Sequence, residues 1–161
     1  RACKFAGAVR FAAVAEASRD LSIPVLANGD IDDAQSAVQA LEQSGADGIM
    51  IGRGAIGQPW IFQELAGAGT PTLAQRLHIM CEHLDHMHRF YGLQQGVRIA
   101  RKHIQAYLQR LDAAALVPEF MRLDTAFAQV AWLSALTEAT ILEQQQRVKA
   151  KPPLAVNSLS C

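Results

Sequence analysis

IPVLANGD at residues 23–30 and ADGIMIGRG at residues 46–54 are two short, mostly apolar runs, and each ends in a glycine-containing turn. Continuous apolar runs of this length are typical of strands that are buried on both faces of a parallel sheet. We therefore predict strands over residues 23–27 and 47–51. These two strands decide the fold class, because parallel strands need a crossover connection between them.

Helical patterns lie before, between and after these strands. Apolar spacing predicts a helix over residues 8–20, and a second helix fits residues 32–44, with an aspartate at its start as N-cap and Gly45 at its end. A short helix is predicted over residues 59–67, followed by a glycine-rich linker at 67–71. The order helix, strand, helix, strand fits either a doubly wound sheet or a (β/α)8 barrel.

The chain has no strand signals from Thr72 onward. One apolar stripe at helical spacing covers residues 73–91, where Gly92 ends the helix, and another covers residues 97–111. Two more helices are predicted over residues 118–131 and 132–148. These patterns predict a small antiparallel helical bundle.

The composition narrows the function classes. The 161 residues include 15 basic and 15 acidic ones, which argues against a generally basic nucleic-acid binder but allows a local basic patch. Cys3, Cys81 and Cys161 form no CxxC pair, so we expect ordinary thiols in a reducing cytosol. No apolar run approaches the roughly 20 residues of a membrane span. The chain begins without methionine, and we expect it to be truncated.

Two glycine motifs follow the predicted strands directly. Asn28, Gly29 and Asp30 follow the first strand, and Gly52 and Arg53 follow the second. Glycine lets the backbone approach a phosphate, an arginine adds a forked positive charge, and helix N-termini after both loops favour an anion. Each motif alone reads as a tight turn, whereas the pair favours a phosphate site like the one after strands seven and eight of a barrel.

A basic cluster lies in the predicted helical part. Arg98, Arg101 and Lys102 are spaced i, i+3 and i+4, so they share a helix face, and no acidic residue lies within one turn in sequence. The alternatives are a solvated face and a surface that contacts RNA phosphates. We expect no metal site from His78, His83, His86 and His88, because no carboxylate-rich group accompanies them.

Three strings resemble the tRNA-dihydrouridine synthases, most closely their bacterial B-type branch: IPVLANGDIDD, SGADGIMIGRGAIGQPWIF and GVRIARKHIQAYLQ. The opening RACKF is similar to the sequence that follows the sixth barrel strand of that family. The resemblance covers roughly residues 1–112, and beyond them only the helical character is shared.

This resemblance implies an FMN-dependent (β/α)8 barrel with a C-terminal helical domain that holds tRNA. It implies reduction of uridine to dihydrouridine, with NADPH as the reductant and a cysteine as the acid. The resemblance also assigns residues to flavin, phosphate and tRNA contacts. It places Asn28, Gly29 and Asp30 at flavin-contacting positions and Gly52 and Arg53 at the FMN phosphate. With the resemblance, contact with tRNA phosphates is favoured over a solvated face for Arg98, Arg101 and Lys102. The catalytic cysteine is expected upstream, so no catalytic residue is assigned.

The predicted fold class is therefore α/β, with the C-terminal part of a TIM barrel followed by an all-α bundle. We expect barrel residues at 1–70, a helical tRNA-binding domain at 71–150 and a disordered tail at 151–161. The predicted function is a cytoplasmic tRNA-dihydrouridine synthase without metal or membrane association, of which this piece alone is inactive. The alternatives are another FMN barrel, such as a dihydroorotate dehydrogenase, and a non-catalytic RNA-binding remnant.

Overall fold

The computed structural model describes residues 9–150, with side chains described for residues 9–140. Cys3, Cys161 and the predicted disordered tail at 151–161 lie outside the described residues. The described chain divides into two compact units. Residues 9–71 and 102–117 make up the first unit, and residues 72–101 and 118–150 make up the second. Each helix of residues 9–150 is too short or too polar to cross a membrane.

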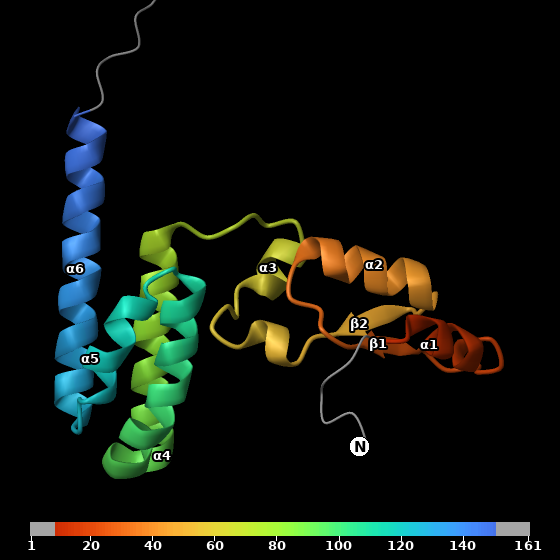
Figure 1. The fold of residues 1–161 in the computed structure, drawn as a ribbon, viewed down its shortest axis with the longest axis horizontal. Helices are drawn as coiled ribbons and strands as arrows, with labels where there is room; N and C mark the ends of the chain where they lie inside the picture. The colour runs from red at the N-terminus through yellow and green to blue at the C-terminus, as the bar shows by residue number, and fades with distance from the viewer. Residues whose placement is uncertain (1–8, 151–161) are drawn as a thin grey trace, which may run out of the picture. The chain divides into compact units, whose positions relative to one another are not determined.

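The first unit contains the predicted alternation of helices and strands (Figure 1). Its elements before the linker, in order, are α1 Phe11–Ser18, β1 Leu26–Asn28, α2 Ala34–Ser44, β2 Gly48–Met50, the 3-10 helix η1 Arg53–Ala55, and α3 Ile61–Leu65. Every element predicted here from sequence is present, though each is shorter than expected. The 3-10 helix η1 was not predicted.

The two strands pair in parallel, as expected, with Ala27 opposite Ile49. Ala27 is fully buried, and Ile49 packs against the buried cluster that Ile31, Ala37 and Ala40 form around α2. The expectation of burial on both faces is wrong for the described residues, because Leu26 is 59% exposed and Met50 is 48% exposed. Successive side chains of a strand point to opposite faces, so one face of this sheet packs on α2 and the other is open.

Helix α2 has the predicted caps at both ends. The Ser36 N–H donates to Asp33 Oδ1 at 2.7 Å, and the Asp33 N–H donates to Ser36 Oγ at 3.1 Å. This reciprocal capping box satisfies backbone donors that the first turn leaves unpaired. The hydrogen bonds from Ser36 also lower the pKa of the Asp33 carboxyl. At the other end, Gly45 adopts a left-handed conformation and its N–H donates to the Leu41 carbonyl.

Helix α4 (Leu73–Arg110) is a hairpin of two arms. Gly92 has φ 75° and ψ 165°, which is not helical, so the chain turns at the glycine that was predicted to end the helix. The arms approach closely, because a Cβ at Gly96 would lie 2.9 Å from His88 Cα. Most residues of the two predicted apolar stripes are buried, whereas Leu73 and Tyr91 at the ends of the first stripe are exposed. The buried members are Leu77, Met80, Leu84, Met87, Val97, Ala100, Ile104 and Leu108.

The remaining helices differ from the prediction. They are η2 Ala114–Leu116, α5 Val117–Met121 and α6 Ala126–Ala150. The predicted boundary between residues 131 and 132 is wrong, because it falls inside α6. The helix begins earlier, where the Ala128 N–H donates to Thr125 Oγ1 at 3.1 Å in an N-cap. Helix α6 packs on both arms of α4 through Gln129, and the wider prediction of an antiparallel bundle stays a prediction.

The second arm of α4 also completes the core of the first unit. Gly57 has φ 78°, and a Cβ built on it would lie 2.5 Å from the carbonyl carbon and oxygen of Ala106. Next to this contact, the rings of Trp60 and Tyr107 lie 5.9 Å apart, both buried. Burial raises the pKa of Tyr107 to about 12. The loop after β2 therefore packs directly on the backbone of α4, where only a glycine fits.

We expect Gly57→Ala to destabilise the intact protein far more than Gly67→Ala. Both glycines have φ near 78°, so each alanine adds a left-handed strain of about 1–2 kcal/mol. Only the Gly57 variant also pushes a Cβ into the Ala106 backbone, since nothing lies within 4 Å at Gly67. Urea unfolding of the two variants measures the difference, and equal losses would show that the Gly57 contact is unimportant.

Candidate functional site

The loops that follow β1 and β2 leave the sheet at the same end, because the strands are parallel and Asn28 lies opposite Met50. The predicted site residues at this end are Asn28, Gly29, Asp30, Gly52 and Arg53. An ion pair joins the two loops directly, with Arg53 Nη2 donating to Asp30 Oδ1. The structure thus brings together the two motifs that the sequence placed one βα repeat apart.

The Arg53–Asp30 pair lies in solvent, with both side chains more than half exposed. Exposed ion pairs contribute little stability, with a median of about 0–1 kcal/mol. An anion with more negative charge than a carboxylate can therefore replace Asp30 at small cost. The ion pair holds the guanidinium of Arg53 against the loop that follows β1.

The two glycines of the motifs have different surroundings. A Cβ at Gly29 would lie 2.6 Å from Val9 Cγ2, and the residue has φ 145°, so its packing explains the glycine without a ligand. A Cβ at Gly52 would meet nothing within 4 Å. The Gly52 backbone is therefore open to a ligand, whereas Gly29 supports the turn.

The expectation of anion-binding helix N-termini after both loops needs correction. The N-terminus of α2 is already capped by the carboxylate of Asp33. The segment after Gly52 is the single-turn 3-10 helix η1 rather than an α-helix, so it provides little helix dipole. Positive charge at this end of the sheet comes instead from the side chain of Arg53.

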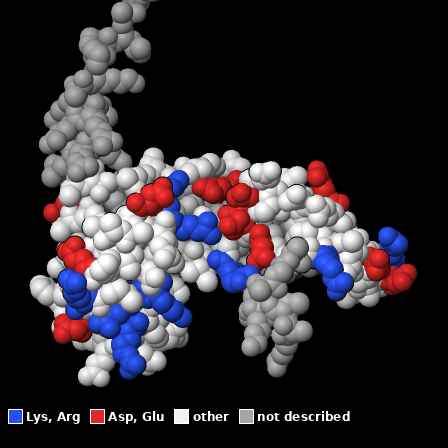
Figure 2. All heavy atoms as spheres, viewed as in Figure 1, with Lys and Arg blue, Asp and Glu red and all other residues white. Residues whose placement is uncertain are grey.

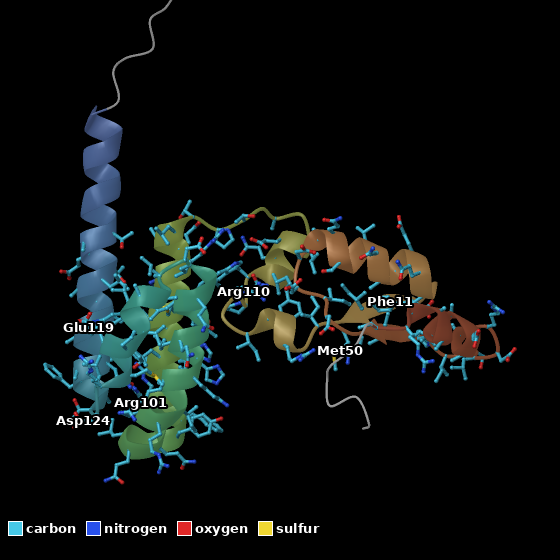
Figure 3. All side chains as sticks on the ribbon, viewed as in Figure 1. Phe11, Met50, Arg101, Arg110, Glu119 and Asp124 are labelled. Carbon is cyan, nitrogen blue, oxygen red and sulfur yellow. The ribbon has the colours of Figure 1, made fainter. Side chains whose placement is uncertain are left out.

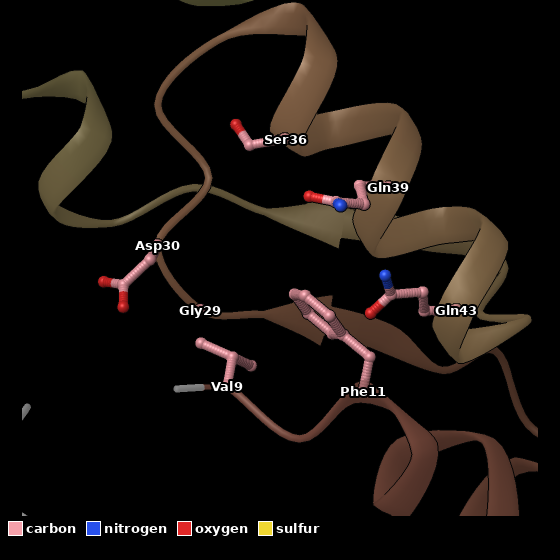
Figure 4. Close-up of a pocket in the computed structure, with 7 residues that line it drawn as sticks. All are labelled: Val9, Phe11, Gly29, Asp30, Ser36, Gln39 and Gln43. Carbon is pink, nitrogen blue, oxygen red and sulfur yellow. The ribbon is translucent and has the colours of Figure 1, made fainter. Parts of the chain in front are cut away.

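A cavity of about 330 Å³ opens beside the loop after β1 (Figure 4). The residues that line it are Val9, Phe11, Gly29, Asp30, Ser36, Gln39 and Gln43. The amides of Gln39 and Gln43 reach it from α2, and the ring of Phe11 reaches it from α1 (Figure 4). Gly52 and Arg53 do not line this cavity, but Asp30, the ion-pair partner of Arg53, does.

The three basic residues predicted on one helix face are not equivalent. Arg98 and Lys102 are exposed, whereas Arg101 is only partly exposed. Arg101 Nη2 donates to the Leu123 carbonyl at 3.0 Å, at the connection between α5 and α6 (Figure 3). Its Nε is buried without a hydrogen-bond partner among the described residues. Arg101 thus has a structural role that the sequence did not reveal, because its partner is a backbone carbonyl.

Comparison of the sequence with known protein families identifies the family to which the chain belongs. The family model for dihydrouridine synthases (Dus) matches residues 1–145, which is most of the chain. The chain belongs to the dihydrouridine synthase family.

Its curated relatives include three bacterial proteins named tRNA-dihydrouridine synthase B. The protein of Xanthomonas axonopodis pv. citri (strain 306) is 44% identical over 138 residues, which cover 79% of this chain and 41% of the relative. The Vibrio cholerae protein is 42% identical, covering 81% and 43%. The Escherichia coli (strain K12) protein is 44% identical, covering 68% and 36%. The chain therefore spans about two fifths of the length of these relatives.

The helical unit of this Dus family member also contains a buried polar network that the sequence does not predict. His88 Nε2 lies 2.9 Å from Gln129 Oε1, and Gln129 Nε2 donates to the Val97 carbonyl at 3.2 Å. Gln129 is fully buried. Nothing in the local sequence predicts that it is buried, and only its contacts reveal that it joins α6 to both arms of α4.

The remaining candidates for chemistry in the described residues are histidine and cysteine side chains. The side chains described for residues 9–140 contain no group of three or more histidine, cysteine or carboxylate side chains that would hold a metal. Burial lowers the pKa of His83 and raises the pKa of the Cys81 thiol. A raised pKa disfavours the thiolate, so Cys81 is a poor nucleophile.

Proposed function

We propose that this chain is the C-terminal part of a tRNA-dihydrouridine synthase, comprising the last two strands of a (β/α)8 barrel and a tRNA-binding helical domain. The observation that carries the proposal is the Asp30–Arg53 contact at the shared carboxyl end of two parallel strands in a Dus family member. Barrel enzymes bind ligands at this end of their strands. The relatives' names supply the substrate class.

The open face of the sheet supports the barrel. Leu26 and Met50 point away from α2 and are about half exposed. In a closed barrel this face points inward, where side chains from all eight strands fill the interior. The other six strands would come from the part of the relatives that this chain does not cover. Burying these side chains in the interior would add to the stability of the whole protein.

The residues at the end of the two loops fit the phosphate of FMN. Arg53 offers an exposed, forked guanidinium, and the backbone of Gly52 is open to approach. Asn28 and Asp30 lie at the end of β1, where they would contact the rest of the flavin. Asp30 would then change partner from Arg53 to the flavin or to solvent when the phosphate arrives.

When bound, reduced FMN supplies the hydride for reduction of uridine, and NADPH is the proposed source of that hydride. This chain's contribution is to bind and orient the cofactor through Gly52 and Arg53. We place the cysteine that would donate the proton accompanying this hydride in the part of the relatives that this chain does not cover. The described piece alone is accordingly proposed to be inactive.

Replacing Arg53 with alanine in the intact protein should weaken FMN binding by about ten- to a hundred-fold, since a hydrogen bond to a charged group contributes roughly 1.5–3 kcal/mol. Arg110→Ala is the matched control. Arg110 also pairs with a carboxylate of the same unit, Asp32, at 3.6 Å, but lies outside the two loops. Titration of the apo protein with FMN measures both variants. An Arg53→Ala dissociation constant equal to that of Arg110→Ala would remove Arg53 from the site.

We propose further that Arg98 and Lys102 contact backbone phosphates of tRNA. Both side chains are exposed on α4, and no acidic residue lies within one turn of them. Phosphate contacts position the RNA without reading its sequence. Arg101 is proposed to join them through Nη1 while its Nη2 holds the Leu123 carbonyl.

Alanine at Arg98 or Lys102 should lower affinity for all tRNAs alike and should reduce the slope of log K against log salt by about one unit or less per contact. Arg101→Ala should do the same and also destabilise the protein by roughly 1–3 kcal/mol, because the Leu123 carbonyl loses its charged donor. Filter binding across a salt series, with thermal unfolding of each variant, separates the two effects. Unchanged slopes for Arg98→Ala and Lys102→Ala would show a merely solvated face.

The alternative of another FMN barrel, such as a dihydroorotate dehydrogenase, is disfavoured by the family match over residues 1–145. A non-catalytic RNA-binding remnant predicts tRNA binding without reduction of uridine. Incubating the intact protein with FMN, NADPH and unmodified tRNA, and measuring dihydrouridine, distinguishes an enzyme from such a remnant.

A further inference from the structure

The side chain of Gln58 joins the loop that follows β1 to the loop that follows β2. Its Nε2 donates to the Asp32 carbonyl at 2.8 Å and to the Gly54 carbonyl at 2.8 Å. An amide NH2 group carries two hydrogens, so these two bonds use both donors of the side chain. Asp32 belongs to the loop after β1, and Gly54 belongs to the 3-10 helix η1. We call these two hydrogen bonds the Gln58 clasp.

The Gln58 clasp lies beside a direct contact between the backbones of the two loops. A Cβ at Gly54 would lie 2.9 Å from the carbonyl carbon of Ile31 and closer still to its oxygen. Ile31 is itself almost fully buried, in the cluster that it forms with Ala37 and Ala40. The loop after β2 therefore rests on a part of the loop after β1 that the core of the first unit holds in place.

A short stretch of hydrogen-bonded backbone connects the Gln58 clasp to Arg53. The Ile56 N–H donates to the Arg53 carbonyl at 3.0 Å. The Gln58 N–H donates to the Ala55 carbonyl at 3.2 Å. Consecutive turns of this kind couple the backbone positions of Arg53 and Gln58. Holding Gln58 on the loop after β1 thus also holds Arg53 relative to that loop.

The ion pair between Arg53 and Asp30 is a second link between the loops, but in the proposed function this link opens. Both side chains are more than half exposed, and Figure 2 shows acidic and basic spheres next to each other where the two loops lie in Figure 1. Asp30 would leave Arg53 when the phosphate of FMN arrives. The Gln58 clasp uses neither of these side chains, so it would still hold the loops together after the ion pair opens.

We propose that Gln58 is a positioning residue for the phosphate of FMN, because its two hydrogen bonds hold Gly52 and Arg53 against the loop after β1. The inference rests on the proposed function and adds to it a residue that does not itself touch the cofactor. A site whose groups are already in place loses less conformational freedom when its ligand binds. Gln58 would therefore contribute affinity specifically for the phosphate of the flavin.

A purely structural role for Gln58 is the alternative. Gln58 is partly exposed and its bond to the Asp32 carbonyl lies at the surface, so water can replace the amide at that carbonyl. Neutral hydrogen bonds in such places contribute little net stability. If the role were purely structural, loss of the Gln58 clasp would weaken binding of flavins with and without a phosphate to the same degree.

The experiment titrates the intact apo protein with FMN and with riboflavin, which is the same flavin without the phosphate. Gln58→Met keeps the length of the side chain and removes both donors. It should weaken FMN binding by about five-fold, which corresponds to one neutral hydrogen bond, and leave riboflavin binding unchanged. Gln63→Met is the matched control, because it removes an amide of α3 that donates to the Gly69 carbonyl at 3.4 Å, outside the two loops.

Two further variants separate positioning from stability, and thermal unfolding of each variant measures the latter. In an Arg53→Ala background, Gln58→Met should have much less effect on FMN binding, because a positioning residue acts through the group that it positions. Gln58→Asn keeps the amide on a side chain too short to span both carbonyls. It should lose less affinity for FMN than Gln58→Met does, and it tests the Gln58 clasp if Gln58→Met does not fold.

Equal losses for FMN and riboflavin, or the same loss with and without Arg53, would overturn the positioning role and leave the proposed function standing. The same conclusion would follow if Gln58→Met bound FMN as tightly as Gln63→Met does. A wild-type apo protein that binds FMN no more tightly than riboflavin would overturn the phosphate site itself, and the positioning role with it.

Discussion

The parallel pairing of β1 with β2 is the constraint on which the first unit depends. It sends the loops after both strands to one end, where Asp30 and Arg53 meet. It also requires the crossover helix α2, which covers one face of the sheet through Ala37 and Ala40. The other face carries Leu26 and Met50 and is covered by no described element. The same geometry thus creates the proposed cofactor-binding end and the surface that the upstream barrel strands would cover.

Helix α4 belongs to both units, and this explains why the boundary between them is not a single point in the sequence. Its first arm and the residues just after Gly92 pack with α5 and α6, whereas residues 102–117 pack with the loop after β2. Gly57 and Ala106 meet at backbone distance, so the end of α4 is part of the core of the first unit. A cut at residue 71 would remove that support.

The prediction from sequence was correct where a local signal, such as a capping residue or a helix-ending glycine, decides the structure. Asp33 and Gly45 cap α2, Gly92 ends a helical arm, and the two apolar runs form parallel strands. The prediction failed where long-range contacts decide the outcome. Arg101 binds a backbone carbonyl, and the exposed fraction of Met50 follows from which described elements pack on the sheet. The start of α6 is an exception, because it is set by a local signal: Thr125 caps the helix by accepting a hydrogen bond from the Ala128 N–H.

The most direct test of this account is the rate at which hydrogen peroxide oxidises individual methionines in the intact protein, followed by mass spectrometry. In the chain described here, Met50 is 48% exposed and Met121 is 39% exposed, so exposure alone predicts similar rates. If the sheet is the end of a closed barrel, Met50 faces the interior and should react much more slowly than Met121. Oxidation of Met50 as fast as Met121 would contradict the barrel and the function proposed from it.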